Sequence, residues 1–529
     1  MMFHVFSFLS GAPMNTGFVK RNEKSGPTWL YSKKSRARGA RARDVRWGDF
    51  LNIESIDQDG WAKIKWGSKR YFLPVEDIAT ERPLEVMFLD VGQGDGCVVV
   101  SPEARTDAGA ADHERERIMV IDAGISDNMF GFLRWRFGKL KRAFRFHAAI
   151  ITHPDADHYR GFQKIFSHKN IEFDRIYHNG LMERTGNDLL GPTDASGRYL
   201  TGIVASDTAV RTLYGDPAVR GRKWYPRLLH TAMTSGRVGQ IEMLSTEHGE
   251  SEAGRQWIPG FAPSSGRDVA IEVIGPVVER DAAGNDRLRW FGDGIGSSAK
   301  NTGKTKNGHS VLLRLTLRSF KLFFGGDLNA PAEDFLLRHY GGIGDAQALA
   351  DAVPQASTRL SADVMKSCHH GSNDVTDELL KAVNPFAFVI SSGDEESHAH
   401  PRPDLLGRLG KFGRGDAPLL LCTELLRSTR EEGRAADFKK LALLNKKIEA
   451  PTTSDADRKK LRQERARLTK FIQQRNVGVY GAITVRTDGH HMEISFKLES
   501  PRGKQSWQRY GFRQGAHDEW VPTGGLTSH

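Results

Sequence analysis

The sequence predicts an α/β protein, and two observations lead to that class. Short apolar runs at residues 148–151 and 320–324 and a strand-like run at 363–367 each end where glycine, aspartate or histidine follows within two residues. Parallel strands of α/β folds end in this way where their crossover connections begin, and functional side chains gather at that end. The chain has 529 residues and is 39% hydrophobic, enough to bury a large core and to form more than one structural unit.

The N-terminal region predicts two small units. Residues 1–45 are expected to form a basic, flexible arm, because from residue 14 on they are rich in Gly, Ser, Lys and Arg and poor in apolar side chains. Residues 46–82 contain short alternating runs separated by Asp-Gly and Gly-Ser turns, a pattern typical of a small SH3-like β-barrel. Such barrels bind peptides, nucleic acid or their own catalytic domain, so this unit is one candidate surface for a protein partner.

The segment after the run at 148–151 concentrates metal ligands. His153, Asp155, Asp157 and His158 fall within six residues. Imidazole combined with carboxylate suits Zn, Mn or Fe, and the lack of cysteine in this segment favours a catalytic site over a structural one. The alternative is that these side chains cap a helix and hold a turn, since Asp is a favoured residue at both places.

Two later strand ends supply further candidates. Asp327 follows two glycines after the run at 320–324, and the pair His369-His370 follows the run at 363–367. Either feature alone is typical of an ordinary turn. Because metal sites draw ligands from several strand ends, the recurrence of the same plan indicates one shared site.

The remaining segments predict insertions. Residues 180–268 are Gly-rich and weakly periodic, which predicts a large insertion around the mouth of the cleft. The Gly- and Lys-rich segment 292–308 is expected to cradle phosphate. Residues 428–475 are rich in Ala, Leu, Lys, Arg and Glu around a Pro-Thr-Thr-Ser break, which predicts a charged helical hairpin and a second candidate partner surface. Residues 501–529 are expected to be a tail.

The motifs occur in an order that resembles the metallo-β-lactamase-like hydrolases, and especially the soluble domain of the ComEC-type competence proteins. The residues that carry the resemblance are Leu89–Asp95, Met119–Gly124, the motif from His153 to His158, Asn307–Leu315, Gly326-Asp327, Lys366–Ser372 and His400-Pro401. The resemblance implies a four-layer αβ/βα sandwich over residues 83–500, interrupted by the insertions. It also implies two divalent metal ions, Zn or Mn, as cofactors.

Carried over residue by residue, the resemblance implies that His153, Asp155, Asp157 and His158 are metal ligands and that Asp327 bridges both metals. His369 or His370 would be the remaining ligand, and the sequence does not choose between them. Many relatives have a further histidine ligand between the first motif and the Gly-Asp. This chain has no matching residue, and His178 is the nearest candidate, with a structural histidine as the alternative.

Supporting roles follow from the same resemblance. Asp95 and Asp122 are expected to orient histidine ring nitrogens. His400 is expected to contact the phosphate or protonate the leaving group, and a turn histidine before proline is the alternative. Lys366 and Ser372 are expected to contact phosphate. The catalytic residues are therefore expected to be Asp157, His400 and Lys366.

The expected function is that of a metal-dependent phosphodiesterase, most simply a nuclease that cleaves DNA or RNA. A formal net charge of +11 favours a polyanionic partner, with basic residues concentrated at 20–46 and 439–475, although a solvated surface explains those clusters equally. One alternative is a hydrolase of a small or cell-wall phosphoester or ester. Another is a partner-gated effector of a bacterial defence system.

Cysteine usage and hydropathy indicate the compartment. Cys97, Cys368 and Cys422 are too few and too scattered for a disulfide framework, which suits a reducing environment, so a cytoplasmic location is expected. No run approaches the roughly 20 apolar residues of a membrane span. We therefore expect no membrane association and no role in DNA uptake.

Overall fold

The computed structural model describes the greater part of the chain. The described residues are 16–23, 26–102, 116–186, 189–292, 302–393, 400–423, 435–476, 482–516 and 519–523. Residues 1–15 of the expected arm, 293–301 of the expected phosphate-cradling segment and 524–529 of the expected tail lie outside them.

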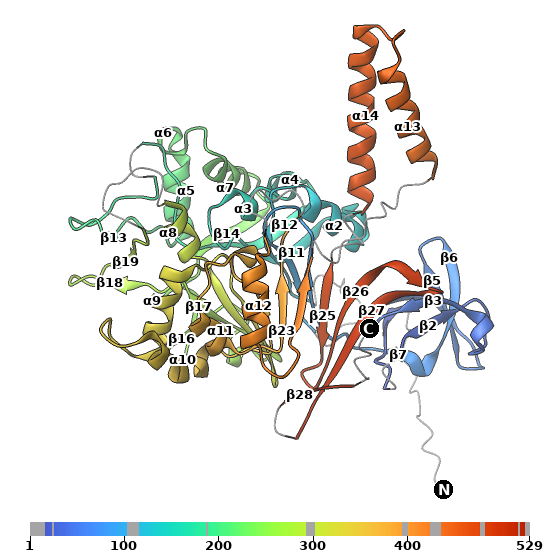
Figure 1. Cartoon of the computed structure of the whole chain (residues 1–529), viewed down its shortest axis with the longest axis horizontal. Coiled ribbons are helices and arrows are strands. Elements are labelled where there is room, and N and C mark those ends of the chain that lie inside the picture. Colours follow the sequence, from blue (N-terminus) through green and yellow to red (C-terminus); the bar gives the residue numbers. More distant parts are fainter. Residues whose placement is uncertain are drawn as a thin grey trace.

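Residues 16–79 form a seven-stranded sheet with the strand order β3-β2-β6-β5-β4-β1-β7 (Figure 1). Its strands are β1 (Thr16–Val19), β2 (Thr28–Tyr31), β3 (Arg41–Val45), β4 (Phe50–Ile56), β5 (Trp61–Trp66), β6 (Lys69–Pro74) and β7 (Ile78–Ala79). The expectation of a flexible arm is therefore wrong for residues 16–45. The few apolar residues of that stretch, among them Val19, Leu30 and Val45, are buried in the core of this sheet. Pairing of β1 with β4 and β7 supplies partners that a polar local composition does not reveal.

A ten-stranded sheet follows, in the order β14-β12-β11-β10-β9-β8-β25-β26-β27-β28. Its strands are β8 (Leu84–Phe88), β9 (Gly96–Val100), β10 (Ile118–Ala123), β11 (Phe144–Ile150), β12 (Ile171–His178), β14 (Val238–Met243), β25 (Ile483–Thr487), β26 (His491–Arg502), β27 (Gln505–Gln514) and β28 (Trp520–Pro522). Strands β10, β11, β12 and β14 are parallel. Because β27 and β28 belong to this sheet, the expectation of a tail from residue 501 is wrong for residues up to 522.

An eight-stranded sheet has the order β15-β16-β17-β20-β21-β22-β23-β24. Its strands are β15 (Glu250–Glu252), β16 (Arg255–Trp257), β17 (Val269–Gly275), β20 (Leu312–Leu317), β21 (Phe320–Phe324), β22 (Val364–Lys366), β23 (Ala387–Ile390) and β24 (Leu419–Cys422). Strands β21 to β24 are parallel. A small third sheet holds β13 (Tyr199–Leu200), β18 (Glu279–Arg280) and β19 (Asp286–Arg289).

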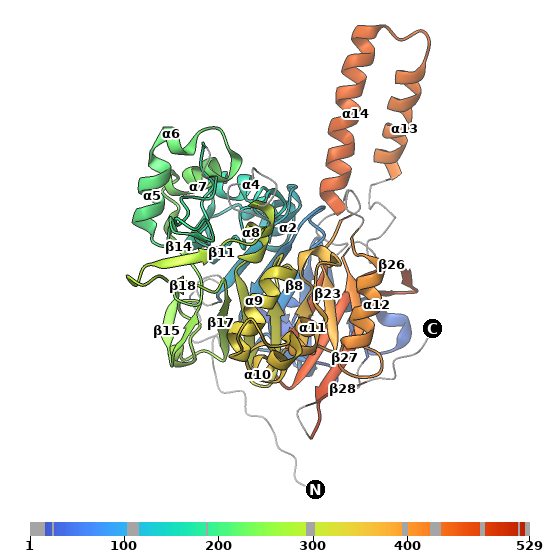
Figure 2. The same cartoon turned by 60° about the vertical axis from the view of Figure 1, so that its left-hand side comes forward.

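The two large sheets pack face to face with helices outside them, which makes the central unit an α/β sandwich (Figures 1 and 2). One apolar core lies between the sheets and contains residues of both, such as Phe88 and Phe324, whose ring centroids are 6.2 Å apart. Helices α2 (Asn128–Arg136), α4 (Phe162–Ser167), α5 (Asp207–Gly215) and α7 (Trp224–Thr234) cover the ten-stranded sheet. Helices α9 (Ala330–Gly341), α10 (Val353–Leu360), α11 (Asp377–Val383) and α12 (Pro403–Phe412) cover the eight-stranded sheet.

The segment 180–268, expected to be an insertion, contributes to both large sheets. It holds α5, α6 (Pro217–Arg220) and α7, but also β14, which pairs in parallel with β12. The strands β15 and β16 extend the edge of the eight-stranded sheet. The weak periodicity of the segment did not reveal these short strands.

A helical hairpin stands away from the body of the molecule (Figures 1 and 2). It consists of α13 (Ala435–Glu449) and α14 (Asp455–Asn476), linked by an ion pair of 2.8 Å between Lys440 and Glu464. In the described part of the chain, no helix combines the length and the apolar character that crossing a membrane requires.

Candidate metal centre

The ends of parallel strands from both large sheets meet at one place. The segment from His153 to His158 follows β11 and includes the short helix α3 (Ala156–Tyr159), while Asp327 follows β21. His370 follows β22. Strand ends fix the backbone on either side of each side chain, so the geometry of the site is set by the packing of the two sheets.

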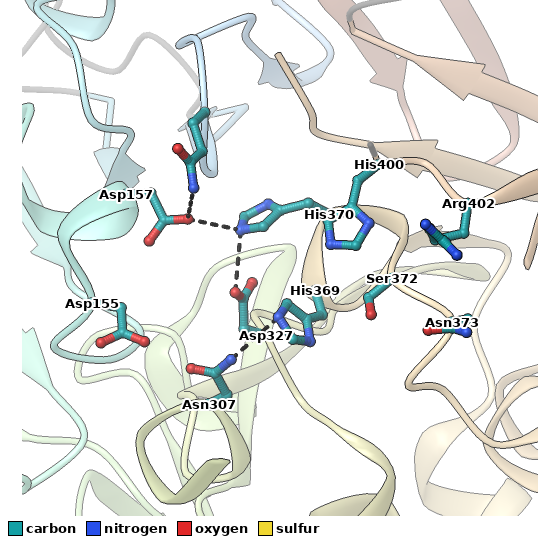
Figure 3. Close-up of a pocket in the computed structure, with 11 residues that line it drawn as sticks. Asp155, Asp157, Asn307, Asp327, His369, His370, Ser372, Asn373, His400 and Arg402 are labelled. Atoms are coloured by element: carbon teal, nitrogen blue, oxygen red, sulfur yellow. Dashed lines mark hydrogen bonds and ion pairs between the residues drawn. The ribbon is translucent and has the colours of Figure 1, made fainter. Parts of the chain in front are cut away.

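The partly buried Asp157 lies beside a buried cluster that His158, His370 and Asp95 form around the carboxylate of Asp327; Figure 3 shows Asp157, His370 and Asp327. Its Oδ2 lies 3.2 Å from His158 Nε2 and 3.1 Å from His370 Nε2. The two Nε2 atoms are 3.3 Å apart, and Asp157 Oδ2 is 3.4 Å from His370 Nε2. His158, His370 and Asp327 are at most 3% exposed.

These separations fit a metal ion. Tetrahedral Zn with bonds of about 2.0–2.1 Å places neighbouring donor atoms about 3.3–3.4 Å apart, close to the distances in the cluster. In the described part of the chain, the buried Oδ1 of Asp327 has no hydrogen-bond partner, as expected of an oxygen that faces a cation. The buried Asp and His side chains can therefore hold a metal ion.

Carboxylates also hold the far side of both histidine rings. Asp122 Oδ2 lies 2.8 Å from His158 Nδ1 and accepts a hydrogen bond from Thr152 Oγ1 at 2.7 Å. Asp95 Oδ1 lies 3.1 Å from His370 Nδ1. These contacts favour the tautomer that leaves Nε2 of each ring free to bind a cation.

Lys366 lies beneath the site rather than in it. Its side chain is buried, forms an ion pair with Asp95 and donates to the carbonyl of Gly326 at 3.0 Å. The expected phosphate contact of Lys366 is therefore wrong, and its expected catalytic role stays a prediction. Because alternate side chains of a strand face opposite sides, its place on β22 turns it inward.

The shifted pKa values of the cluster show that its carboxylates favour positive charge on the neighbouring histidines. Burial lowers the pKa of His158, but Asp327 and Asp122 outweigh burial and hold that pKa well above its usual value. For His370, too, burial is outweighed, by Asp327 and Asp95, and its pKa is raised. Burial also works against charge on Asp327, yet the two histidines keep its pKa well below the usual range. A cation that replaced these protons would satisfy the same carboxylates.

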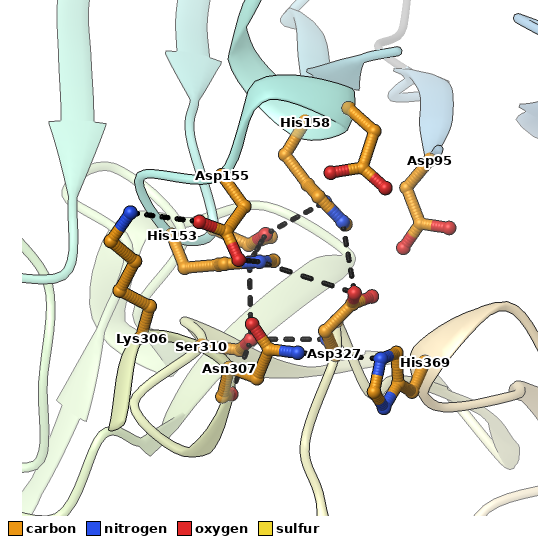
Figure 4. Close-up of polar contacts among 12 residues, drawn as sticks. Asp95, His153, Asp155, His158, Lys306, Asn307, Ser310, Asp327 and His369 are labelled. Carbon is orange, nitrogen blue, oxygen red and sulfur yellow. Dashed lines mark hydrogen bonds and ion pairs between the residues drawn. The ribbon is translucent and has the colours of Figure 1, made fainter. Parts of the chain in front are cut away.

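A second group of candidate ligands lies beside the first and is less compact (Figure 4). His153 Nε2 is 3.7 Å from Asp155 Oδ2 and 4.0 Å from Asp327 Oδ2. Burial lowers the pKa of His153 well below its usual value, so its ring is neutral and able to bind a cation. The ammonium group of Lys306, on α8 (Thr302–Gly308), is 2.9 Å from Asp155 Oδ1.

The cluster opens into a cavity of about 490 Å³. Its lining residues are Gln93, Asp155, Asp157, Asn307, Asp327, His369, His370, Ser372, Asn373, His400 and Arg402 (Figure 3). His400 and Ser372 thus lie on the wall of the cavity. The wall is mostly polar, which suits a charged or hydrophilic substrate.

The structure shows which of the paired histidines, His369 or His370, belongs to the cluster, a choice that the sequence left open. His370 Nε2 belongs to the cluster, whereas His369 Nε2 lies 3.3 Å from the amide of Asn307. His178 is buried at the end of β12, and its Nδ1 accepts a hydrogen bond from the N–H of Gly180 at 3.0 Å. That contact suits a structural role for His178.

Several cavity residues were missed by sequence reasoning. Gln93 Nε2 is 3.5 Å from Asp157 Oδ2 and lies in a motif that was noted without a role for this residue. Lys306 and Asn307 lie in the segment expected to cradle phosphate. Arg402 comes directly after His400-Pro401, but an isolated arginine gives no sequence signal.

Comparison with known proteins gives a distant similarity. The competence protein ComA of Neisseria gonorrhoeae is 29% identical over 130 residues, which are 24% of this chain and 16% of that protein. No family model matches the chain. The similarity thus covers a small part of a much longer relative.

Proposed function

We propose that this protein is a metal-dependent phosphodiesterase with a metallo-β-lactamase-like fold, and that its substrate is DNA or RNA. The observation that carries the proposal is the buried cluster of Asp95, His158, Asp327 and His370, with the partly buried Asp157 beside it, at the floor of a polar cavity. The layered arrangement of the two large sheets, the order of the motifs and the distant similarity to a competence protein support the same assignment.

The residues present fit a centre with two adjacent cation positions for Zn or Mn. Asp157, His158 and His370 would hold one position, His153 and Asp155 the other, and Asp327 faces both. When bound, such ions lower the pKa of water toward neutrality and offset negative charge on a phosphoryl group.

The chain's own side chains perform the remaining tasks. Asp95 and Asp122 hold the histidine rings so that Nε2 points toward the cluster. His400, with its ring centroid 6.0 Å from that of His369, lies where it can donate a proton to a leaving oxygen. Arg402, on the same wall, offers a fork of donors that matches phosphate geometry.

Charge supports a polynucleotide over a small substrate. The net charge of +11 attracts polyanions over a distance that one phosphoester does not need. On the hairpin, the side chains of Lys459, Lys460, Arg462 and Arg465 are exposed. The proposal therefore includes nucleic acid as the partner of the basic surface.

The test is hydrolysis of plasmid, single-stranded DNA and RNA with Mn²⁺ or Zn²⁺, beside the variant Asp157→Ala/Asp327→Ala. We expect cleavage by the native protein and its loss in the variant. The matched control is Asp345→Ala/Asp351→Ala, which removes the same charge from exposed positions. Cleavage by the Asp157→Ala/Asp327→Ala variant at the native rate would refute the proposal. Hydrolysis of bis(4-nitrophenyl) phosphate without cleavage of any polynucleotide would favour a small phosphoester.

A further inference from the structure

The three carboxylates that face the candidate metal positions differ in what surrounds them. In the described part of the chain, Asp157 and Asp327 form ion pairs only with histidines. Asp155 instead faces Lys306 through Oδ1, and the amide nitrogen of Asn307, turned toward it, donates to Oδ2 at 2.9 Å. Both oxygens of Asp155 are thus satisfied by neighbouring residues of α8.

Lys306 is held firmly in that place. Its ammonium group donates to Asp155 Oδ1 at 2.9 Å, to Glu183 Oε1 at 2.7 Å and to the carbonyl of Pro154 at 3.2 Å. An ammonium group has three protons, so each is directed at an acceptor. The side chain of Lys306 is only 14% exposed, as is that of Glu183. The adjacent Thr305 is buried and hydrogen-bonds with the backbone of Phe291, which anchors the helix.

A fixed ammonium group next to Asp155 changes what that position can bind. A divalent ion between His153 and Asp155 would lie within a few ångströms of a positive charge and would have to share a carboxylate that is already paired. Like charges at such a distance repel each other strongly where burial limits screening by water. The ammonium group beside the cluster of His158, Asp327 and His370 is that of Lys366, which is paired with Asp95. Asp327 itself is paired with histidines, so its carboxylate is not already taken up by a lysine.

We propose that Lys306 is the resident cation of the position formed by His153 and Asp155, so that the centre binds one divalent ion tightly and a second only when Lys306 is displaced. This inference rests on the proposed metal centre and specifies how its two positions differ. The ammonium group then supplies a fixed positive charge at the cavity edge, where Asp155 and Asn307 line the wall.

The test counts metal ions directly. The full chain, freed of metal by chelation, is titrated with Mn²⁺ by calorimetry, and bound ions are counted after gel filtration. Electron paramagnetic resonance adds a second readout, because an isolated Mn²⁺ ion and an exchange-coupled pair give different hyperfine patterns. The variants are Lys306→Met, the charge-preserving Lys306→Arg, and Lys304→Met as an exposed control on the same helix.

We expect one tight ion in the native protein and in the control, with the pattern of an isolated ion. Lys306→Met should bind a second ion about 10- to 100-fold more tightly than the native protein and give the pattern of a coupled pair. Lys306→Arg should resemble the native protein. Two ions bound equally tightly by the native protein would overturn the inference but leave the proposed function intact. A folded Lys306→Met variant that still binds only one ion would do the same. A native protein that binds no ion would overturn both.

Discussion

The substitution Asp122→Asn probes how a residue outside the cavity controls the candidate metal centre. Asp122 accepts hydrogen bonds from the N–H of Thr152 at 2.8 Å and from Thr152 Oγ1, and it faces Nδ1 of His158. Its backbone has φ 53°, in the left-handed region that asparagine tolerates best among residues with a side chain. The substitution therefore changes the hydrogen bonding with little backbone strain.

The expected loss of metal affinity follows from which ring nitrogen of His158 carries the proton. Asparagine can still accept from the N–H of Thr152 through its oxygen, but then its NH₂ group faces His158 Nδ1. A donor there favours the tautomer with the proton on Nε2, the atom that points at Asp327. The ring must shift its proton before it can bind a cation, which should weaken metal affinity about 10- to 100-fold.

The assay is competition for Mn²⁺ or Zn²⁺ between the protein and a chelator of known affinity, together with turnover as a function of metal concentration. We expect turnover of Asp122→Asn to recover partly at saturating metal. The control Asp127→Asn alters a carboxylate that pairs with Lys164 and should have no effect on affinity. Native metal affinity in a folded Asp122→Asn variant would show that the carboxylate does not set the tautomer of His158.

Three further predictions concern stability and binding. Arg486→Met should lower the free energy of unfolding by about 3 kcal/mol, measured in urea, because it removes a buried partner of Glu85 and Asp49; a loss below about 1 kcal/mol would show that the remaining arginines compensate. Burial raises the pKa of Glu333 to about 8, so the contribution of this carboxyl group to folding stability should fall as pH rises from 4.5 to 8. The variant Glu333→Gln should lack that fall and be more stable than the native protein by at most roughly 4 kcal/mol at pH 8. A variant with the native pH profile of stability would contradict this. Lys460→Glu/Arg462→Glu should weaken polynucleotide binding and its salt dependence but leave hydrolysis of bis(4-nitrophenyl) phosphate at the native rate; unchanged affinity would exclude the hairpin as a binding surface.

The strand ends recognised in the sequence predicted the position of the candidate site well, but they predicted fewer of the strands around it. The apolar runs before His153 and Asp327 are long enough to be recognised locally, and each belongs to a strand with a parallel neighbour, β11 and β21. The strands β1 and β27 were missed. The partner of β1 lies far along the chain, since Thr16 pairs with Asn52, whereas β27 pairs with the neighbouring β26 and was missed because its composition is mixed. A local pattern predicts a strand where an apolar run or a regular alternation of apolar and polar residues stands out from its surroundings.

The roles of adjacent residues could not be predicted for a related reason. His369 and His370 both have positive φ, 47° and 52°, so the chain turns sharply after β22 and the two rings diverge. Only the turn decides which ring reaches Asp327. Lys366 faces inward and Lys306 reaches the edge of the site, although the sequence of either segment predicts a lysine that contacts phosphate. Side-chain direction at a strand end is a tertiary property, whereas residue type is a local one.

The position of the cluster between two sheets gives metal binding a mechanical consequence. Asp157 and His158 come from the ten-stranded sheet, while Asp327 and His370 come from the eight-stranded sheet. A cation bound by all four would tie the sheets together at the edge where the cavity opens. The apolar core that already joins the sheets, including the contact of Phe88 with Phe324, keeps the strand ends in register before any ion arrives. Because the protein pays for that order during folding, the ion gains affinity from ligands that need little rearrangement. The same order explains why a small change such as Asp122→Asn should be felt in metal affinity rather than in the fold.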